Sequence, residues 1–214
     1  HTSAAVYGHY ANVRRTEGPT EGNITVFWFD HGWFWFIPLM DGVTSIGMVT
    51  WPYFMKTRGK RSLDQFLRDG IAMCPGLAAR MEGATLVNEV EATGNFSYTS
   101  AHNHGRNYVM LGDAFAFIDP VFSSGVLLAM NSGVVAAEAI DTCLKTPHKA
   151  AAALRHFDRQ MRHGPTEFSW FIYRVTNPIM RDLLMHPRNV FRMKEALLSV
   201  LAGDIYGKTP IWRS

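Results

Sequence analysis

The chain has 214 residues, of which 47% are hydrophobic and 18% are charged, so one large domain or two small ones can bury a core. The net charge of +3 comes from scattered basic residues, apart from a short cluster at 56–61 in an expected loop. This charge therefore gives no argument for a nucleic-acid partner. Every apolar run is interrupted by a polar residue or a glycine, which argues against a membrane span.

The two cysteines, Cys74 and Cys143, lie among apolar residues in helical patterns and have neither disulfide-framework nor metal-ligand spacing. They are expected to be buried thiols of a cytoplasmic protein, because the cytosol keeps thiols reduced. The first six residues do not form a signal peptide. The chain lacks an initiator methionine and begins inside an expected strand, so we expect a fragment of a longer protein.

The first half of the chain is predicted to form an antiparallel sheet. A strand is expected at 4–13, and turn residues then separate three strands of a meander, at 23–29, 33–39 and 43–51. A helix is expected after Ser62, which can cap it because Gln65 follows three residues later. A short helix at 76–81 and strands at 85–90 and 94–100 complete this half.

The second half contains one strand-loop-helix unit followed by helices. An apolar strand at 108–111 runs into Gly112 and Asp113, and a buried helix of small apolar residues is expected over 126–140. Further helices are expected at 150–163, 167–175, 180–185 and 187–201. No strand is followed by Gly-x-Gly-x-x-Gly, so a complete doubly wound dinucleotide-binding fold is not predicted. The expected division is 1–107, 108–145 and 146–214.

The strand-loop-helix unit carries the first candidate site. By itself, Gly112-Asp113 after a strand is a common turn. The sequence Asp119-Pro120 and the small residues Ser123–Gly125 nevertheless shape a helix start, where backbone N–H groups can hold an anion or a polarised carbonyl. Asp113 can then accept hydrogen bonds from the hydroxyls of a ligand.

A second motif, Trp33-Phe-Trp-Phe-Ile-Pro38, lies on an expected strand. Alternation places Trp33, Trp35 and Ile37 on one face and the two phenylalanines on the other. A central strand buried on both sides would need no function. Two indoles on one face are nevertheless suggestive, because each N–H needs a partner when it is buried.

Taken together, the two motifs resemble a known family. Gly-Asp-Ala-x-x-x-Ile-Asp-Pro-x-x-Ser-x-Gly, residues 112–125, resembles the second FAD-binding motif of glutathione-reductase-like flavoproteins, in the branch of p-hydroxybenzoate hydroxylase. Trp-x-Trp-x-Ile-Pro, residues 33–38, is similar to the signature of the flavin-dependent halogenases, the tryptophan halogenase-like family. The resemblance runs through most of the chain. It implies an α+β or α/β fragment with an antiparallel substrate-domain sheet, one FAD-binding strand-loop-helix element and a helical carboxyl-terminal region.

The resemblance implies a role for each motif residue. Asp113 would bind the ribityl chain of FAD, and Gly112, also in the cofactor site, would allow close approach of the backbone. Pro120 would lie beside the isoalloxazine ring. Ser124, Gly125 and Val126 would present backbone N–H groups to the flavin, and Ser124 and Gly125 also to chloride or bromide. The residues that would separate flavin from substrate are Trp33, Trp35, Ile37 and Pro38.

In this family, reduced FAD and O2 oxidise a halide to hypohalous acid, which halogenates an aromatic or carrier-bound substrate. A flavin reductase would be the partner that supplies reduced FAD. The catalytic lysine and the phosphate-binding glycines of the family are expected upstream of this chain, and Lys56 and Lys60 lie in the wrong region to replace that lysine. We therefore expect the isolated chain to be inactive.

Other features leave alternatives open. Phe122 stands where some tryptophan halogenases carry a glutamate, which favours a carrier-bound or phenolic substrate over free indole. His102 and His104 lack further ligands, so no metal site is predicted, and Ser124 lacks the spacing of a nucleophile elbow. The alternatives are a flavin-dependent monooxygenase or reductase of the same fold and, from another class, a non-catalytic binding or scaffold domain.

Overall fold

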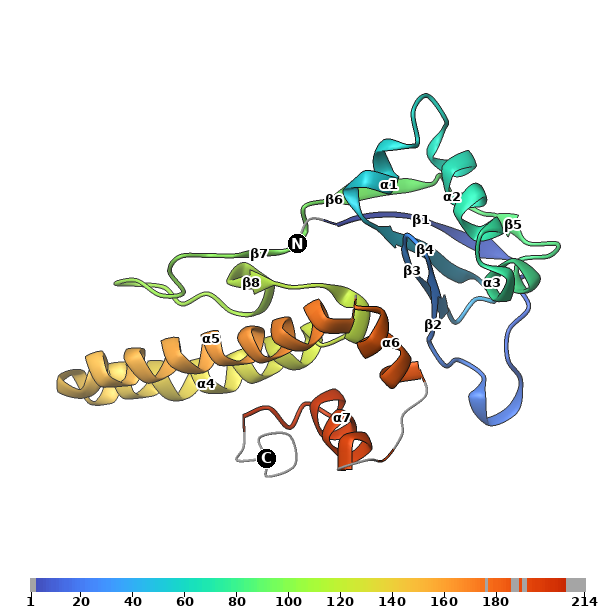
Figure 1. Ribbon diagram of the computed structural model, residues 1–214. Coiled ribbons are helices and arrows are strands. Elements are labelled where there is room, and N and C mark those ends of the chain that lie inside the picture. The colour runs from blue at the N-terminus through green and yellow to red at the C-terminus, as the bar shows by residue number, and fades with distance from the viewer. Residues whose placement is uncertain (1–2, 176, 186–188, 190–191, 207–214) are drawn as a thin grey trace. The chain divides into compact units, whose positions relative to one another are not determined.

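A computed structural model describes residues 3–175, 177–185, 189 and 192–206 (Figure 1). It divides the chain into two compact units, His1–Phe96 and Ser97–Ser214. Both predicted domain borders, after residues 107 and 145, fall inside the second unit. The two units are described separately below.

The first unit contains an antiparallel sheet. Its strands follow the order β2-β3-β4-β1-β5, and β6 also pairs with β1. The bounds are β1 Ala4–Ala11, β2 Thr25–Phe29, β3 Gly32–Pro38, β4 Thr44–Thr50, β5 Thr85–Leu86 and β6 Glu91–Gly94. The predicted meander is therefore confirmed as β2, β3 and β4, each hydrogen-bonded to the next.

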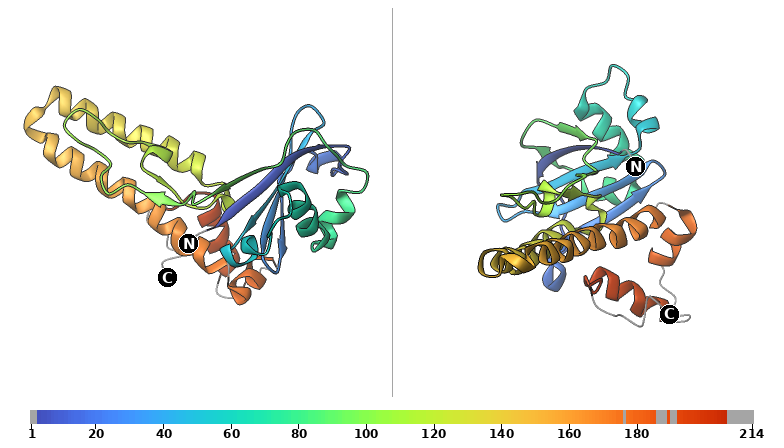
Figure 2. Two further views of the ribbon diagram at one scale, coloured as in Figure 1. Left: turned by 90° about the horizontal axis from the view of Figure 1, so that it is seen from above. Right: turned by 90° about the vertical axis from the view of Figure 1, so that its left-hand side faces the viewer.

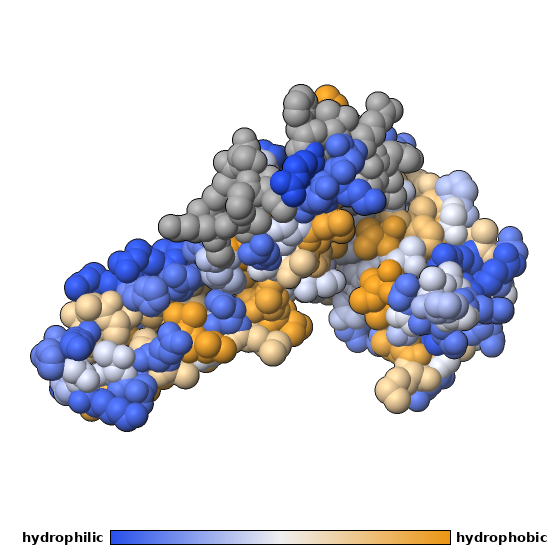
Figure 3. All heavy atoms as spheres, turned by 90° about the horizontal axis from the view of Figure 1, so that it is seen from below, coloured by the Kyte–Doolittle hydropathy of each residue, from blue (hydrophilic) through white to orange (hydrophobic). Residues whose placement is uncertain are grey.

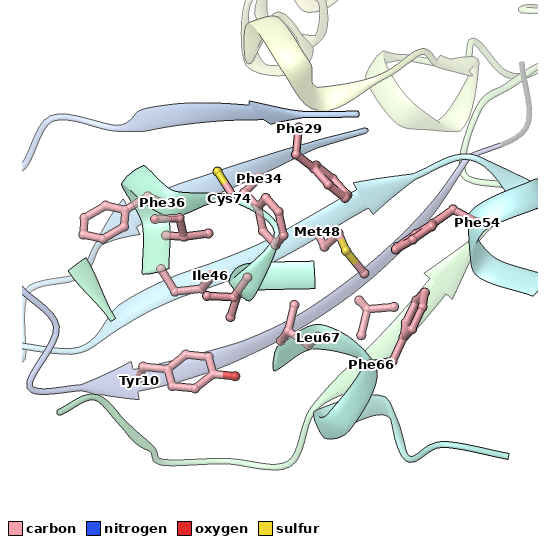
Figure 4. Close-up of a cluster of buried hydrophobic side chains, with 13 residues drawn as sticks. Tyr10, Phe29, Phe34, Phe36, Ile46, Met48, Phe54, Phe66, Leu67 and Cys74 are labelled. Atoms are coloured by element: carbon pink, nitrogen blue, oxygen red, sulfur yellow. The ribbon is translucent and has the colours of Figure 1, made fainter. Parts of the chain in front are cut away.

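One face of this sheet forms the core with the helix α2, Leu63–Ala72. Phe34 and Phe36 of β3 are almost fully buried and belong to the same cluster as Phe66 and Leu67 of α2 (Figure 4). The predicted cap is present, because the Gln65 N–H donates to Ser62 Oγ at 3.1 Å. The two-residue period of β3 thus decides which side chains face the helix.

Several predicted elements of the first unit are shorter than expected or were missed. A short helix, α1 Pro52–Lys56, was not predicted; Pro52 occupies its first turn, where a missing N–H costs nothing. The expected strand at 85–90 is only β5, which pairs with β1 over two residues. The helix expected at 76–81 is α3 Pro75–Arg80, and a 3-10 turn, η1, covers Gly18–Thr20.

The expected strand at 94–100 is also wrong. Asn95 has a φ of 53°, a left-handed conformation that ends β6 after Gly94. A separate two-residue strand, β7 Tyr98–Thr99, then pairs with β8 Ala116–Phe117 in the second unit.

Two long helices dominate the second unit. The helices α4 Gly125–Lys145 and α5 Ala150–Val175 pack side by side and are joined by η4 Pro147–Lys149 (Figure 2). Their shared core with β8 is small and apolar, with Phe115, Phe157 and Met161 buried against Ala136 and Ala139. The small residues of α4 allow this close approach of the two helices.

The helices expected at 150–163 and 167–175 are one continuous helix, so that prediction is wrong. α5 passes through Gly164 and Pro165, two residues that disfavour a helix interior. α6 Pro178–Met185 begins two residues earlier than predicted, and α7 covers Met193–Leu201. The predicted start of the last helix includes residues 187, 188, 190 and 191, which lie outside the described residues.

The strand predicted at 108–111 does not form. Val109 makes only an isolated antiparallel bridge with His104, and the Met110 N–H donates to the Asn103 carbonyl at 2.7 Å. A strand requires a partner along its length, and the described neighbour is a short loop. Tyr108 and Leu111 are accordingly exposed rather than buried.

The prediction that α4 is a buried helix is also wrong. One side packs on the rest of the unit through Ser132, Ala136 and Ala139. The other side exposes apolar residues, which Figure 3 shows as patches among polar side chains on the arm formed by α4 and α5; the exposed large ones are Val126, Leu127, Met130, Val134, Ile140 and Leu144. Among the described helices, α4 is also long and apolar enough to cross a membrane. Length and composition of a single helix do not by themselves identify a membrane span.

The phenol of Tyr10 gives a testable prediction. Its side chain is 2% exposed, and its hydroxyl has no hydrogen-bond partner among the described residues. Burial raises the pKa of Tyr10 to about 12, since the charged form loses solvation. Because this pKa is higher in the folded than in the unfolded protein, the linked stabilisation of the folded state is fully present below the unfolded value near 10. It is lost as the pH rises toward 12.

We therefore expect the free energy of unfolding of Tyr10→Phe to equal or exceed that of the wild type at pH 7, by up to about 2 kcal/mol. The advantage of the variant should grow by about another 2 kcal/mol between pH 9.5 and 12. Urea unfolding of both proteins over this pH range measures it. Tyr108→Phe, at an exposed tyrosine, is the control. Parallel pH profiles of wild type and Tyr10→Phe would contradict the prediction.

Candidate functional site

Gly112 brings the candidate site into contact with α4. It begins a 3-10 turn, η2 Gly112–Ala114, and has a φ of 48°. A Cβ at this position would lie 2.9 Å from the Cβ of Ala129. Glycine is thus required twice, for a left-handed backbone and for close contact with the helix.

Asp113 follows on the outer side of this turn and is exposed. Its backbone carbonyl accepts a hydrogen bond from the Tyr98 hydroxyl at 2.6 Å, which fixes the turn to β7. No hydrogen bond or ion pair to its carboxylate is found among the described residues. The carboxylate therefore remains available to accept hydrogen bonds from the hydroxyls of a ligand.

The chain then reaches α4 through a second 3-10 turn, η3 Pro120–Phe122. The Asp119 carboxylate accepts from the Val121 N–H at 3.0 Å, so this aspartate caps the turn. Ser123 has a φ of 52°, and its N–H donates to the Pro120 carbonyl at 2.9 Å. These local bonds reverse the chain directly before the helix.

The start of α4 presents free backbone donors. The first bond of the helix runs from the Leu128 N–H to the Ser124 carbonyl at 3.1 Å, so the N–H groups of Gly125, Val126 and Leu127 precede it. Ser124 is buried and makes no side-chain cap, whereas Val126 is 70% exposed. A 21-residue helix adds the positive end of its dipole, which favours an anion or a polarised carbonyl here.

The sequence did not identify Ser132, which joins the two parts of this site. The Ser132 side chain is 2% exposed, and its Oγ accepts from the Gly112 N–H at 3.0 Å while donating to the Ala129 carbonyl. A serine inside an apolar helix was the available signal. The structure thus brings Gly112, Asp113 and the first turns of α4 together in one unit.

The tryptophan motif lies in the first unit. Trp33, Trp35 and Ile37 share one face of β3, as alternation predicted, and Pro38 ends the strand. Trp35 Nε1 donates to Ser45 Oγ at 3.0 Å, and its indole covers Gly47, where a Cβ would lie 2.1 Å from the ring. The Trp35 indole therefore packs on Gly47 and bonds to Ser45, both of β4, and the sequence motif did not reveal these two contacts.

The other candidates do not gather into a site. Phe122 packs on Phe171 of α5, with ring centroids 4.9 Å apart. Within the described residues, no three His, Cys, Asp or Glu side chains form a metal-binding group. Cys74 is buried, which raises the pKa of its thiol, but Cys143 is only partly buried, so the expectation of two buried thiols holds for one.

Comparison with known proteins identifies the family. The model of the family described as tryptophan halogenase matches residues 9–177. The chain belongs to the tryptophan halogenase family. The resemblance found in the two sequence motifs is therefore confirmed.

Curated members of this family are similar over most of the chain. A tryptophan 2-halogenase of Chondromyces crocatus is 32% identical over 159 residues, which are 73% of this chain and 30% of that protein. A 1H-pyrrole-2-carbonyl-[peptidyl-carrier protein] chlorinase of Pseudomonas fluorescens is 28% identical over 81% of this chain and 38% of its own length. The chain thus spans less than half the length of these relatives.

Solved halogenases share the fold. The myxobacterial chondrochloren halogenase CndH is 30% identical with a TM-score of 0.75, over 99% of this chain and 51% of that one. The brominase Bmp2 has a TM-score of 0.85 at 24% identity, over 98% of this chain and 52% of its own. These likenesses confirm the expected fold, a mixed α and β fragment with an antiparallel sheet and a helical carboxyl-terminal region.

Removal of the Ser132 hydroxyl tests how the site is held. In Ser132→Ala the partly buried Gly112 N–H loses its acceptor, which lowers the free energy of unfolding by about 1–3 kcal/mol. Urea unfolding followed by circular dichroism measures the change. Thr142→Ala is the matched control, because its hydroxyl bonds to the Glu138 carbonyl at an exposed position of the same helix. Equal stabilities of the two variants would show that the Gly112 contact does not depend on Ser132.

Proposed function

We propose that this chain supplies the carboxyl-proximal, flavin-facing part of an FAD-dependent halogenase. The observation that carries the proposal is an exposed, unpaired Asp113 carboxylate beside a helix whose first N–H groups precede its own hydrogen bonds. Membership of the family supports FAD as the cofactor. A point mutant of the halogenase PltM, which shares the fold at a TM-score of 0.70, has been solved in complex with FAD.

The residues fit this cofactor by their chemistry. Asp113 offers acceptors for the ribityl hydroxyls of FAD. Ser124, Gly125 and Val126 offer donors and a positive helix end to the flavin, and Ser124 and Gly125 also to chloride or bromide. Pro120 lies in the turn directly before this helix start, where it would border the flavin ring.

When bound, reduced FAD would supply two of the four electrons that O2 accepts and the halide the other two, so that, with one further proton, one oxygen atom would leave as water and the other as hypohalous acid. The residues of this chain would hold the flavin and the halide and keep the organic substrate apart from the flavin. Trp33, Trp35, Ile37 and Pro38 of β3 would form a wall between flavin and substrate, and the Trp35 indole is oriented by its hydrogen bond to Ser45 Oγ. A rigid wall of this kind disfavours direct hydroxylation of the substrate.

The substrate class and partners are part of the proposal. We favour an aromatic substrate that is carrier-bound or phenolic, because a pyrrole-carbonyl carrier-protein chlorinase and brominase are among the relatives. Phe122, packed on Phe171, leaves no carboxylate at this position for a free indole. A flavin reductase would supply reduced FAD, and the cytoplasm is the expected location.

Halide dependence tests the proposed chemistry. The full-length protein, given reduced FAD, O2 and an aromatic substrate, should yield halogenated product only when chloride or bromide is present. Product is measured by mass spectrometry with and without halide. Hydroxylated product at the same rate in both conditions would instead identify a monooxygenase, and no FAD binding at all would favour a scaffold domain.

Asp113→Ala tests the cofactor site. The variant should bind FAD more weakly by about 1–3 kcal/mol, because charge-assisted hydrogen bonds to ligand hydroxyls are lost. Quenching of FAD fluorescence in the full-length protein measures the dissociation constant. Asp141→Ala, at an exposed residue that pairs with Lys145 on α4, should leave it unchanged. Equal affinities of Asp113→Ala and wild type would remove Asp113 from the site.

A further inference from the structure

The Gly164-Pro165 pair in the middle of α5 has no local explanation. Glycine and proline both disfavour a helix interior, and the proline also leaves a carbonyl of the preceding turn without its N–H partner. The pair nevertheless lies inside a continuous 26-residue helix. A packing requirement from outside the helix must therefore account for it.

The side chain of Tyr206 supplies this requirement. A Cβ at Gly164 would lie 2.2 Å from the Tyr206 hydroxyl and 2.6 Å from Leu128 Cδ2. Pro165 and Tyr206 also line one small apolar pocket. Gly164 and Pro165 thus form a notch in α5, and the phenol of Tyr206 occupies it.

The backbone around Tyr206 is fixed to the same two long helices. Ile205 is fully buried, and the His163 Nε2–H of α5 donates to its carbonyl at 2.8 Å. Gly203 has a φ of 82°, and a Cβ there would lie 2.3 Å from Leu127 Cδ2. The segment Gly203–Tyr206 therefore packs on the first turn of α4.

The same segment also lies close to the candidate site. The phenol of Tyr206 lies close to the Asn131 side chain of α4. The pocket that Tyr206 lines also has Gly112, Phe115 and Leu128 in its wall. Tyr206 thus contacts the helix directly behind the free N–H groups and borders the glycine that begins the flavin motif.

We propose that Tyr206 is a positioning residue for the first turn of α4. Seated in the Gly164-Pro165 notch, it clamps the segment Gly203–Tyr206 against Leu127 and Asn131 and so fixes the direction in which the N–H groups of Gly125 and Val126 point. This inference rests on the proposed function, in which those groups face the flavin and the halide.

Hydrogen exchange tests the clamp without any cofactor. In Tyr206→Ala, the amides of residues 128–131 should exchange at least tenfold faster than in the wild type, because the first turns of α4 lose their support. Tyr206→Phe keeps the ring and should rescue most of the protection. Leu198→Ala, an exposed residue of α7, is the control. Unchanged exchange in Tyr206→Ala would overturn the clamp.

A double-mutant cycle tests the notch. Gly164→Ala places a methyl group where the phenol lies, so it should accelerate exchange strongly in the wild type and several-fold less in the Tyr206→Ala background. Equal effects in the two backgrounds would show that Gly164 serves only the contact with Leu128.

Chloride affinity tests the positioning role. In the FAD-bound full-length protein, the chloride dissociation constant, read from the change in flavin absorbance, should rise at least fivefold in Tyr206→Ala and stay within twofold in Leu198→Ala. Faster exchange with unchanged chloride affinity would reduce Tyr206 to a packing contact. If chloride did not change the flavin absorbance of the wild type, the proposed halide site itself would be refuted. If chloride changed the absorbance of wild type and Tyr206→Ala equally, only the positioning role of Tyr206 would be refuted.

Discussion

The close contact between Gly112 and α4 is the constraint on which the second unit depends. The Gly112 N–H donates a hydrogen bond to Ser132 Oγ of the helix, and the absence of a Cβ allows the Gly112 backbone to contact Ala129. A turn and a helix start are thereby held together although Asp113 and Gly125 are twelve positions apart in the sequence. This contact thus sets the distance between the Asp113 turn and the N–H groups at the start of α4.

The first unit depends on a different constraint, the alternation of β3. One face of the strand gives Phe34 and Phe36 to the core with α2, so the opposite face is free to carry two indoles. The indole of Trp35 lies on Gly47 and donates to Ser45, both on the neighbouring strand. The strand β3 thus supplies core side chains from one face and two large indoles from the other.

The helices show how a small set of residues can serve a site from a distance. Gly164 and Pro165 are poor choices for local structure, yet the contact that Tyr206 makes with α5 accounts for the pair. Gly203 suits its place locally, because it has a left-handed φ directly after the end of α7. Residues that conflict with local preference thus mark tertiary contacts. In this chain they mark the support behind the start of α4.

The sequence by itself determined the family, the meander of β2 to β4, the cap at Ser62 and the residues at the start of α4, because each depends on neighbours in the chain or on strict alternation. Tertiary structure decided the rest. The strand expected at 108–111 lacks a partner along its length, and α5 continues through Gly164-Pro165 because a distant tyrosine fills the notch. Ser132, Ser45 and Tyr206 could not be found from the sequence, since their roles come from residues 10–75 positions away that only folding brings into contact.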